Sequence, residues 1–296
     1  MSTPHGEVRA AVAAASGRGR LPHALLLVGP AGLGQHELAR WIARLRWCAA
    51  AESPCDACGP CRRVLTGNHP DLTVIERDPP PERDPEGHGS KHEITVDQIR
   101  HDLVGALSIS AVEGAGRTVI LDEADALNVE AQNALLKTLE EPPAGTLLVL
   151  VASRPEALLD TVRSRCQEHR LRPLDSAALA QAVGRDPGPW AALAGGRPGR
   201  WHELQALDVG ALIEAADGLL AGRVSGAAFA GRMREAVAAA GACEPPLDEG
   251  AARQLVLEVL HTRLADLVFL VSGGHAEGSR TPAPADLEPL EPAEHE

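Results

Sequence analysis

Residues 24–36 read ALLLVGPAGLGQH, and this stretch decides the fold of the chain. Its first five residues are an apolar run of strand length that ends at a glycine-rich loop, and a helical pattern follows from Glu37 to about Cys48. A strand, a glycine-rich loop and a helix in this order are typical of the first unit of a nucleotide-binding α/β domain, because the loop and the helix N-terminus present N–H groups to phosphate.

Alternating strand and helix patterns extend this domain to about residue 170. We predict three further strands and three further helices, at residues 71–76, 117–121 and 146–152 and at residues 6–16, 95–107 and 128–140. Asn128 is placed to cap the last of these helices. Strands that alternate with helices favour a parallel sheet with helices on both faces. Residues 77–93 are rich in proline, glycine and charge without periodicity, so we predict a mobile surface loop there.

Helical patterns replace strand patterns after about Pro173. They cover four stretches, at residues 176–193, 209–220, 225–240 and 250–271, with a glycine- and proline-rich turn at residues 195–199. The last stretch is apolar over so much of its girth that it must pack against several neighbours or a partner chain. Residues 273–296 carry six acidic residues against Arg280 alone, and we predict that they form a disordered acidic tail.

Composition limits the classes of function. The net charge of −13 argues against a strongly basic DNA-binding surface, because phosphate neutralisation drives most non-specific affinity for DNA. No apolar run approaches the ~18 residues of a membrane span, and the N-terminus lacks the layout of a secretory signal, so we expect a cytoplasmic protein that does not enter a membrane. Four of the six cysteines lie within residues 48–61, which in that compartment indicates a metal site rather than disulfides.

The glycine-rich loop departs from a working phosphate-binding loop. Such a loop reads G-x-x-x-x-G-K-[ST], where the lysine neutralises the terminal phosphates and the hydroxyl binds Mg²⁺. Here Gly29 and Gly34 keep the frame, but Gln35 and His36 follow. Glutamine carries no charge, and a neutral imidazole is a poor ligand for Mg²⁺, which prefers oxygen. We therefore predict a degenerate site at which ATP binds weakly or not at all.

A second acidic motif lies at residues 118–125, TVILDEAD. An apolar strand that ends in Asp122 and Glu123 places two carboxylates at the carboxyl edge of a parallel sheet, where α/β folds bind ligands. In a working ATPase the aspartate holds Mg²⁺ and the glutamate polarises the attacking water. Without a lysine in the glycine-rich loop, we expect this pair to be a remnant of a nucleotide site.

The cysteine cluster predicts a structural metal. Cys48, Cys55, Cys58 and Cys61 lie close enough along the chain to close tetrahedrally around Zn²⁺ and to leave no open position for catalysis. An iron–sulfur cluster is the alternative, because the last three cysteines share the spacing of bacterial ferredoxins. That spacing expects a following cysteine and proline, whereas Arg62 comes next. We expect His69 to be a loop residue rather than a ligand.

Taken together, these motifs resemble the bacterial DNA polymerase III clamp-loader family, which contains delta-prime and tau/gamma subunits. The matching strings are RLPHALL (20–26), the four-cysteine module after the first helix, HPD (69–71), I-x3-QIR (94–100), ALLKTLEEPP (134–143) and SRC (164–166). The resemblance is dense over residues 17–175, and beyond them only the helical layout is similar.

The resemblance implies an AAA+ fold and a division of the chain. It assigns residues 1–170 to a nucleotide-binding-like α/β domain with the zinc module at 48–61, residues 171–203 to a small helical lid, and residues 204–272 to a helical collar that joins a pentamer. Motor subunits of this family keep the loop lysine and threonine and a lid arginine that senses the γ-phosphate. This chain has Gly199 where that arginine is expected, and Arg200 beside it. These departures resemble the delta-prime branch, which is not an enzyme by itself.

On this resemblance, Arg165 is an arginine finger that reaches the ATP site of an adjacent tau/gamma subunit. A guanidinium suits that role because it is permanently charged and forked towards phosphate oxygens. The implied partners are the tau/gamma and delta subunits and, through the DNA polymerase III complex, the sliding clamp and primed DNA. Two other functions stay open, a divergent tau/gamma-like ATPase and a zinc-bearing DNA-binding module that uses Arg62 and Arg63.

Overall fold

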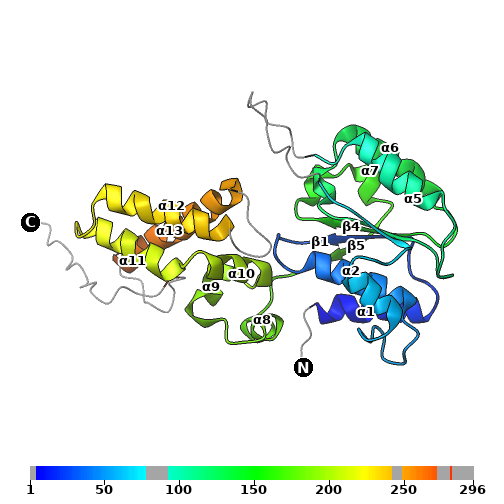
Figure 1. Ribbon diagram of the computed structural model, residues 1–296, viewed down its shortest axis with the longest axis horizontal. Helices are drawn as coiled ribbons and strands as arrows, with labels where there is room; N and C mark the ends of the chain where they lie inside the picture. Colours follow the sequence, from blue (N-terminus) through cyan, green and yellow to red (C-terminus); the bar gives the residue numbers. More distant parts are fainter. Residues whose placement is uncertain (1–4, 78–92, 242–248, 272–280, 282–296) are drawn as a thin grey trace, which may run out of the picture. The chain divides into compact units, whose positions relative to one another are not determined.

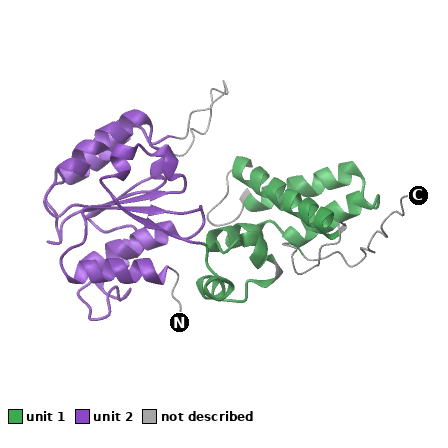
Figure 2. Ribbon diagram, turned by 180° about the vertical axis from the view of Figure 1, so that it is seen from behind, with its two compact units in different colours: residues 1–4, 173–296 green, residues 5–172 purple. Residues whose placement is uncertain are grey.

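The computed structural model describes residues 5–77, 93–241, 249–271 and Thr281. The predicted loop at 77–93 and the predicted acidic tail at 273–296 lie outside the described residues, apart from the two ends of the loop and Thr281. The chain divides into two compact units, residues 5–172 and a second unit that begins at Pro173 (Figure 2).

The first unit is built on a five-stranded parallel sheet. In chain order the strands are β1 (Ala24–Val28), β2 (Leu72–Ile75), β3 (Thr118–Leu121), β4 (Leu147–Ala152) and β5 (Gln167–Arg170). Their order across the sheet is β2-β3-β4-β1-β5, so β1 lies between β4 and β5. Every residue of β1, β3 and β4 is buried, as expected for central strands that helices cover on both faces. The predicted parallel sheet is thus confirmed.

Helices cover both faces of this sheet (Figure 1). The helical elements of the unit are α1 (Gly6–Gly17), α2 (Gln35–Trp47), α3 (Gly59–Leu65), α4 (Val96–Gln98), a π-helical turn (Ile99–Val104), α5 (Gly105–Leu107), α6 (Val129–Glu140) and α7 (Asp160–Arg163), with short 3₁₀ turns at Ala124–Ala126 and Pro155–Ala157. One hydrophobic cluster joins α1 and α2 to the sheet, and another joins the π-helical turn, α6 and α7 to its opposite face. Asn128 caps α6 by accepting a hydrogen bond from the N–H of Ala131 at 2.8 Å, as predicted.

The helix predicted at residues 95–107 is present in altered form. Thr95 and Gln98 form a capping box at its start, where the side chain of each bonds to the backbone N–H of the other. Its middle part, Ile99–Val104, is π-helical, with Ile99 and Leu103 fully buried against the sheet. Apolar periodicity predicted the buried face but not the change in winding, because the two forms share the same inward-facing residues here.

The second unit is entirely helical in its described part. Its helices are α8 (Ser176–Val183), α9 (Ala191–Ala194), α10 (Pro198–Ala206), α11 (Val209–Leu220), α12 (Gly226–Gly241) and α13 (Glu249–Val271), with a 3₁₀ turn at Gly188–Trp190. One hydrophobic core, with the buried Trp201 among its members, runs through residues of all six helices. The division into a lid and a collar at residues 203–204 therefore stays a prediction.

Candidate functional site

The glycine-rich loop leaves β1 at the carboxyl edge of the sheet and enters α2. Two of its glycines are required by the backbone. A Cβ on Gly29 would lie 2.9 Å from the carbonyl oxygen of Leu171, and Gly34 has a φ of +89°. The close approach to Leu171 and the turn into α2 thus account for both glycines, whether or not a phosphate binds.

Gln35, at the position of the missing lysine, is turned back onto the loop. Its side-chain amide donates hydrogen bonds to the carbonyl oxygens of Gly29 at 2.7 Å and Pro30 at 2.9 Å, and the residue is 4% exposed. His5 adds a third anchor, because its Nε2 lies 2.7 Å from the carbonyl oxygen of Leu33. The loop is held by its own chain and offers no side-chain charge from position 35.

His36, at the position of the missing hydroxyl, bonds directly to Asp122. Its Nδ1 lies 2.6 Å from Asp122 Oδ2, and Arg40 Nε donates to its Nε2 at 2.7 Å. In the neutral imidazole, the donation from Arg40 to Nε2 leaves the proton on Nδ1, where it faces the carboxylate. The hydrogen bond to Asp122 raises the pKa of His36 and outweighs burial and the charge of Arg40, which lower it. One oxygen of the predicted Mg²⁺-binding carboxylate is thus already bound by the protein.

Glu123 is also engaged. It adopts a left-handed conformation with a φ of 52°, and both of its carboxylate oxygens accept hydrogen bonds from the guanidinium of Arg77, one of them at 2.6 Å from Nε. Arg77 was not among the predicted site residues, because it fell in the predicted loop. A signal was present, because Arg77 follows β2 and β2 pairs with β3, so their carboxyl ends meet at the same edge.

Arg165 lies just beyond α7 with its side chain 36% exposed. Its Nη1 donates to the carbonyl oxygen of Thr161 at 2.9 Å, and its Nη2 donates to Glu140 Oε1 at 2.7 Å. Cys166, the next residue, packs against the core, and burial raises the pKa of its thiol to about 12. The Ser-Arg-Cys stretch therefore directs its arginine outward and its cysteine inward. Among the described residues, no hydrogen bond or ion pair joins Arg165 to the loop, Asp122 or Glu123.

The four predicted cysteines come together. Their sulfur atoms all lie within 4.8 Å of one another, and Cys48 Sγ is 4.0 Å from Cys58 Sγ. Four thiolates at the Zn–S distance of ~2.3 Å would be ~3.8 Å apart, so the cluster has the size of a tetrahedral site. The N–H of Cys58 donates to Cys55 Sγ at 3.3 Å, and backbone hydrogen bonds from Ala57 and Cys58 lower the pKa of the Cys55 thiol. These residues fit a bound metal ion.

His69 stays outside this cluster, as predicted. It is 3% exposed, stacks on Trp47 with ring centroids 3.9 Å apart, and places its Nε2 3.3 Å from a carboxylate oxygen of Glu113. Its neighbour Asp71 is fully buried and accepts hydrogen bonds from the N–H groups of Val112 and Glu113. The His-Pro-Asp stretch thus fastens the loop before β3 to the start of β2.

The arginines beside the cysteine cluster also have partners within the chain. Arg62 Nε donates to the carbonyl oxygen of Ala57 at 2.7 Å, and Arg63 forms an ion pair with Glu113. Arg62 is thus held within the cysteine module, and Arg63 is held by the loop before β3 that also bonds to Asp71. These contacts do not by themselves indicate a surface for nucleic acid.

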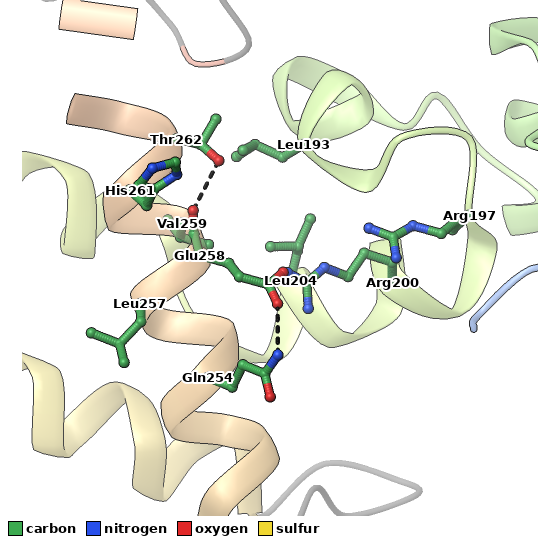
Figure 3. Close-up of a pocket in the computed structure, with 10 residues that line it drawn as sticks. All are labelled: Leu193, Arg197, Arg200, Leu204, Gln254, Leu257, Glu258, Val259, His261 and Thr262. Carbon is green, nitrogen blue, oxygen red and sulfur yellow. Dashed lines mark hydrogen bonds and ion pairs between the residues drawn. The ribbon is translucent and has the colours of Figure 1, made fainter. Parts of the chain in front are cut away.

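Arg200, in the second unit, lies at a hollow of about 380 Å³ between α10 and α13 (Figure 3). Its side chain is 13% exposed and forms ion pairs with Glu203, at 3.4 Å, and with Glu258. Glu258 also accepts a hydrogen bond from Gln254 at 3.2 Å. Arg200 thus links α10 to α13, and its partners are carboxylates of its own unit.

The fold and the site define a parallel α/β protein with a four-cysteine cluster and a glycine-rich loop whose following side chains bond within the chain. The model of the family described as "DNA polymerase III, delta subunit" matches residues 6–175, more than half of the chain, so the chain belongs to this family.

Among the described residues, no helix is both long and apolar enough to cross a membrane.

Individual relatives agree with this assignment. The DNA polymerase III subunit delta' of Pseudomonas aeruginosa is 41% identical over 194 residues, which are 62% of this chain and 55% of that protein. Subunit delta' of Bacillus subtilis is 34% identical over 161 residues, 54% of this chain and 45% of that protein. Subunit tau of Escherichia coli is 31% identical over 159 residues, 53% of this chain and 23% of that protein. The chain spans about half the length of these delta' relatives.

Among solved structures, the gamma-subunit-related protein of Thermotoga maritima is 17% identical, and the match covers 90% of this chain and 86% of that one. Its TM-score is 0.42, too low to bear on function.

Proposed function

We propose that the chain is a non-catalytic, delta-prime-type subunit of a bacterial DNA polymerase III clamp loader, which helps to place the sliding clamp on primed DNA. The observation that carries the proposal is that the carboxylates of the ATP site are bonded within the chain and Arg165 is not withdrawn from the surface. His36 and Arg77 bind the two carboxylates that an ATPase would need free, whereas Arg165 stays exposed at the surface. The chain has lost its own ATP chemistry and keeps an arginine that can serve another subunit.

The residues that replace the lysine and the hydroxyl of the glycine-rich loop make ATP binding weak. Loss of the one charge-assisted contact from a lysine costs about 1.5–3 kcal/mol, which is roughly tenfold to a hundredfold in affinity. A Mg²⁺ ion would in addition have to displace His36 from Asp122. Both penalties act on the same ligand, so Mg·ATP binds this chain poorly and is not hydrolysed by it.

Arg165 acts in trans in this proposal. Its guanidinium reaches the ATP site of an adjacent tau/gamma-type subunit and stabilises the charge that develops during phosphoryl transfer, a role for which arginine is suited. Residues 171–203 form the lid, and residues 204–272 form the collar through which the chain joins the tau/gamma and delta subunits. The complex works in the cytoplasm, and its other members contact the clamp and the DNA.

Two kinds of measurement test the proposal, binding assays with the isolated chain and reconstitution of the complex. In the first, Mg·ATP is titrated into the isolated chain by calorimetry, and we expect weak or undetectable binding and no turnover. Tight binding with turnover would reject the proposal in favour of a divergent tau/gamma-like ATPase. A salt-sensitive DNA-binding assay with the same chain is expected to show no strong binding, and a strong signal lost in Arg62→Ala would favour the DNA-binding alternative.

The second measurement is reconstitution with tau/gamma-type and delta subunits. Arg165→Ala is expected to leave the complex assembled and to slow clamp loading and ATP hydrolysis. Arg170→Ala is a matched control, because Arg170 is 69% exposed and its ion pair among the described residues is with Glu168 nearby. Equal activity of Arg165→Ala and the wild type would exclude the finger role.

We infer that the four cysteines hold a structural Zn²⁺. A closed set of four thiolates suits this ion and leaves no position for a substrate. Metal analysis of the colourless pure protein is expected to give one zinc per chain. A brown protein with iron and acid-labile sulfide would instead indicate an iron–sulfur cluster.

A further inference from the structure

Glu140 is the last residue of α6, and its position is unfavourable for the helix itself. A helix C-terminus carries partial negative charge, so an acidic side chain there is repelled by the last carbonyl groups. Glu141 follows at once as the C-cap, and two prolines then end the helix. The stability of the helix therefore does not explain why a carboxylate lies at residue 140.

The contact that Glu140 makes is with Arg165. Its Oε1 accepts a hydrogen bond from Arg165 Nη2 at 2.7 Å, and the carbonyl oxygen of Thr161 accepts one from Nη1 at 2.9 Å. The two acceptors come from different helices, α6 and α7, so they fix the plane of the guanidinium between them. Both side chains stay accessible, with Arg165 36% and Glu140 51% exposed.

These two contacts leave part of the guanidinium available. Arginine has five N–H donors, and the contacts with Glu140 and Thr161 use two of them. The remaining donors are enough for a bidentate contact with phosphate. Glu140 thus holds the arginine without consuming the groups that would meet an anionic ligand.

We propose that Glu140 is a positioning residue, which orients Arg165 before the neighbouring subunit docks. The inference rests on the proposed function, in which Arg165 reaches the ATP site of that neighbour. A long exposed side chain must lose rotamer freedom when it binds, and a carboxylate that already fixes it removes part of this cost. Loss of the carboxylate is expected to slow the arginine-dependent step about two- to tenfold.

The experiment uses the complex reconstituted with tau/gamma-type and delta subunits, and it measures kcat and KM for ATP. Glu140→Ala is expected to lower kcat about two- to tenfold with KM nearly unchanged, because the chain still folds and still assembles. Glu140→Gln keeps an oxygen that can accept from Nη2, and it is expected to restore most of kcat. Glu141→Ala removes the same charge one residue away and is expected to have no effect.

Further variants separate this inference from the proposed function. Arg165→Ala is expected to lower kcat more than Glu140→Ala. The variant that combines both substitutions is expected to have the same kcat as Arg165→Ala, because Glu140 acts only through the arginine. Thermal unfolding of each isolated variant checks that the fold is intact.

Three results would decide against the inference. If Arg165→Ala lowers kcat and Glu140→Ala does not, the finger role survives and the positioning role is wrong. If Glu140→Ala raises kcat, the carboxylate restrains the arginine rather than preparing it. If Arg165→Ala itself has no effect, the proposed function fails and the positioning role fails with it.

Discussion

The side chains at positions 35 and 36 are both bonded within the chain. Gln35 binds carbonyl oxygens of the glycine-rich loop, and His36 binds Asp122, a carboxylate that a nucleotide site needs free. The two residues therefore weaken ATP binding in two ways. They supply neither the charge nor the hydroxyl of a working loop, and His36 in addition obstructs Asp122. The obstruction is visible only in the folded chain, because residues 36 and 122 lie far apart in sequence.

Restoring the two residues tests this account. The double variant Gln35→Lys with His36→Thr is expected to bind Mg·ATP about ten to a hundred times more tightly than the wild type, because it supplies the charge and frees Asp122. Turnover is expected to stay slow, since Arg77 still binds Glu123. Calorimetry measures the affinity, and Gln35→Lys alone serves as the control with a smaller gain. No gain in the double variant would mean that the site has lost more than these two groups.

The His36–Asp122 contact also predicts a dependence of stability on pH. The folded chain raises the pKa of His36, so it binds the imidazole proton more tightly than the unfolded chain does. The resulting stability is fully present below the unfolded pKa of about 6.5 and is lost as the pH rises through the folded pKa. We therefore expect His36→Gln to lower the free energy of unfolding more at about pH 5.5 than at about pH 8.5. Urea denaturation at the two pH values checks this, and an equal loss at both would contradict it.

At the scale of elements, segments with an apolar run or an apolar helical period could be predicted, and segments without one could not. The strand at residues 24–28 and the helix at residues 209–220 have the predicted bounds, because a run of apolar residues or a helical period marks both. β5 was not predicted, because Gln167–Arg170 reads QEHR and carries no apolar signal, although it pairs with β1. α10 was not predicted either, because its first two residues fell in the predicted turn at 195–199. Pro198 in fact occupies the first position of the helix, where proline is favoured.

The candidate site shows the same limit. Motif spacing identified the positions of the loop, the acidic pair and the cysteines. It did not identify the partners Arg77 and Glu140, because these residues come from other elements that only the fold brings close to Glu123 and Arg165. The resemblance named the arginine, and the structure added the carboxylate beside it.

The cysteine cluster organises the segment between α2 and α3. Cys48 ends α2, Cys58 caps the start of α3, and Cys61 lies within α3 and is fully buried. The buried residues Trp47 and Val64 belong to a small hydrophobic cluster that is separate from the larger cores. With so small a core, we expect this segment to depend on the proposed metal for much of its stability.

Removal of one ligand tests that dependence. Cys61→Ser is expected to lose the bound metal and to lower the unfolding temperature of the first unit. Cys166→Ala is the matched control, because Cys166 is a described cysteine outside the cluster, and it is expected to keep one metal per chain. Metal analysis and thermal unfolding of both variants make the comparison. Full metal content in Cys61→Ser would contradict the four-cysteine site.

For the whole molecule, the separate hydrophobic cores of the two units predict that each unit can lose stability without the other. The second unit contains a buried ion pair that allows a test. Arg263 is 1% exposed, and its guanidinium donates to both carboxylate oxygens of Asp217, at 2.9 Å and 2.5 Å, which joins α13 to α11. Removal of one partner from a buried pair leaves the other charge uncompensated and typically costs about 3–5 kcal/mol.

Arg263→Leu is therefore expected to destabilise the second unit by about 3–5 kcal/mol and to leave the first unit unchanged. The tryptophans separate the two transitions, since Trp41 and Trp47 lie in the first unit and Trp190 and Trp201 in the second. Urea unfolding followed by fluorescence, in variants that keep only one of these pairs, reports each unit alone. A shift confined to Trp190 and Trp201 fits two independent cores, whereas an equal shift in both pairs would mean that the units unfold as one.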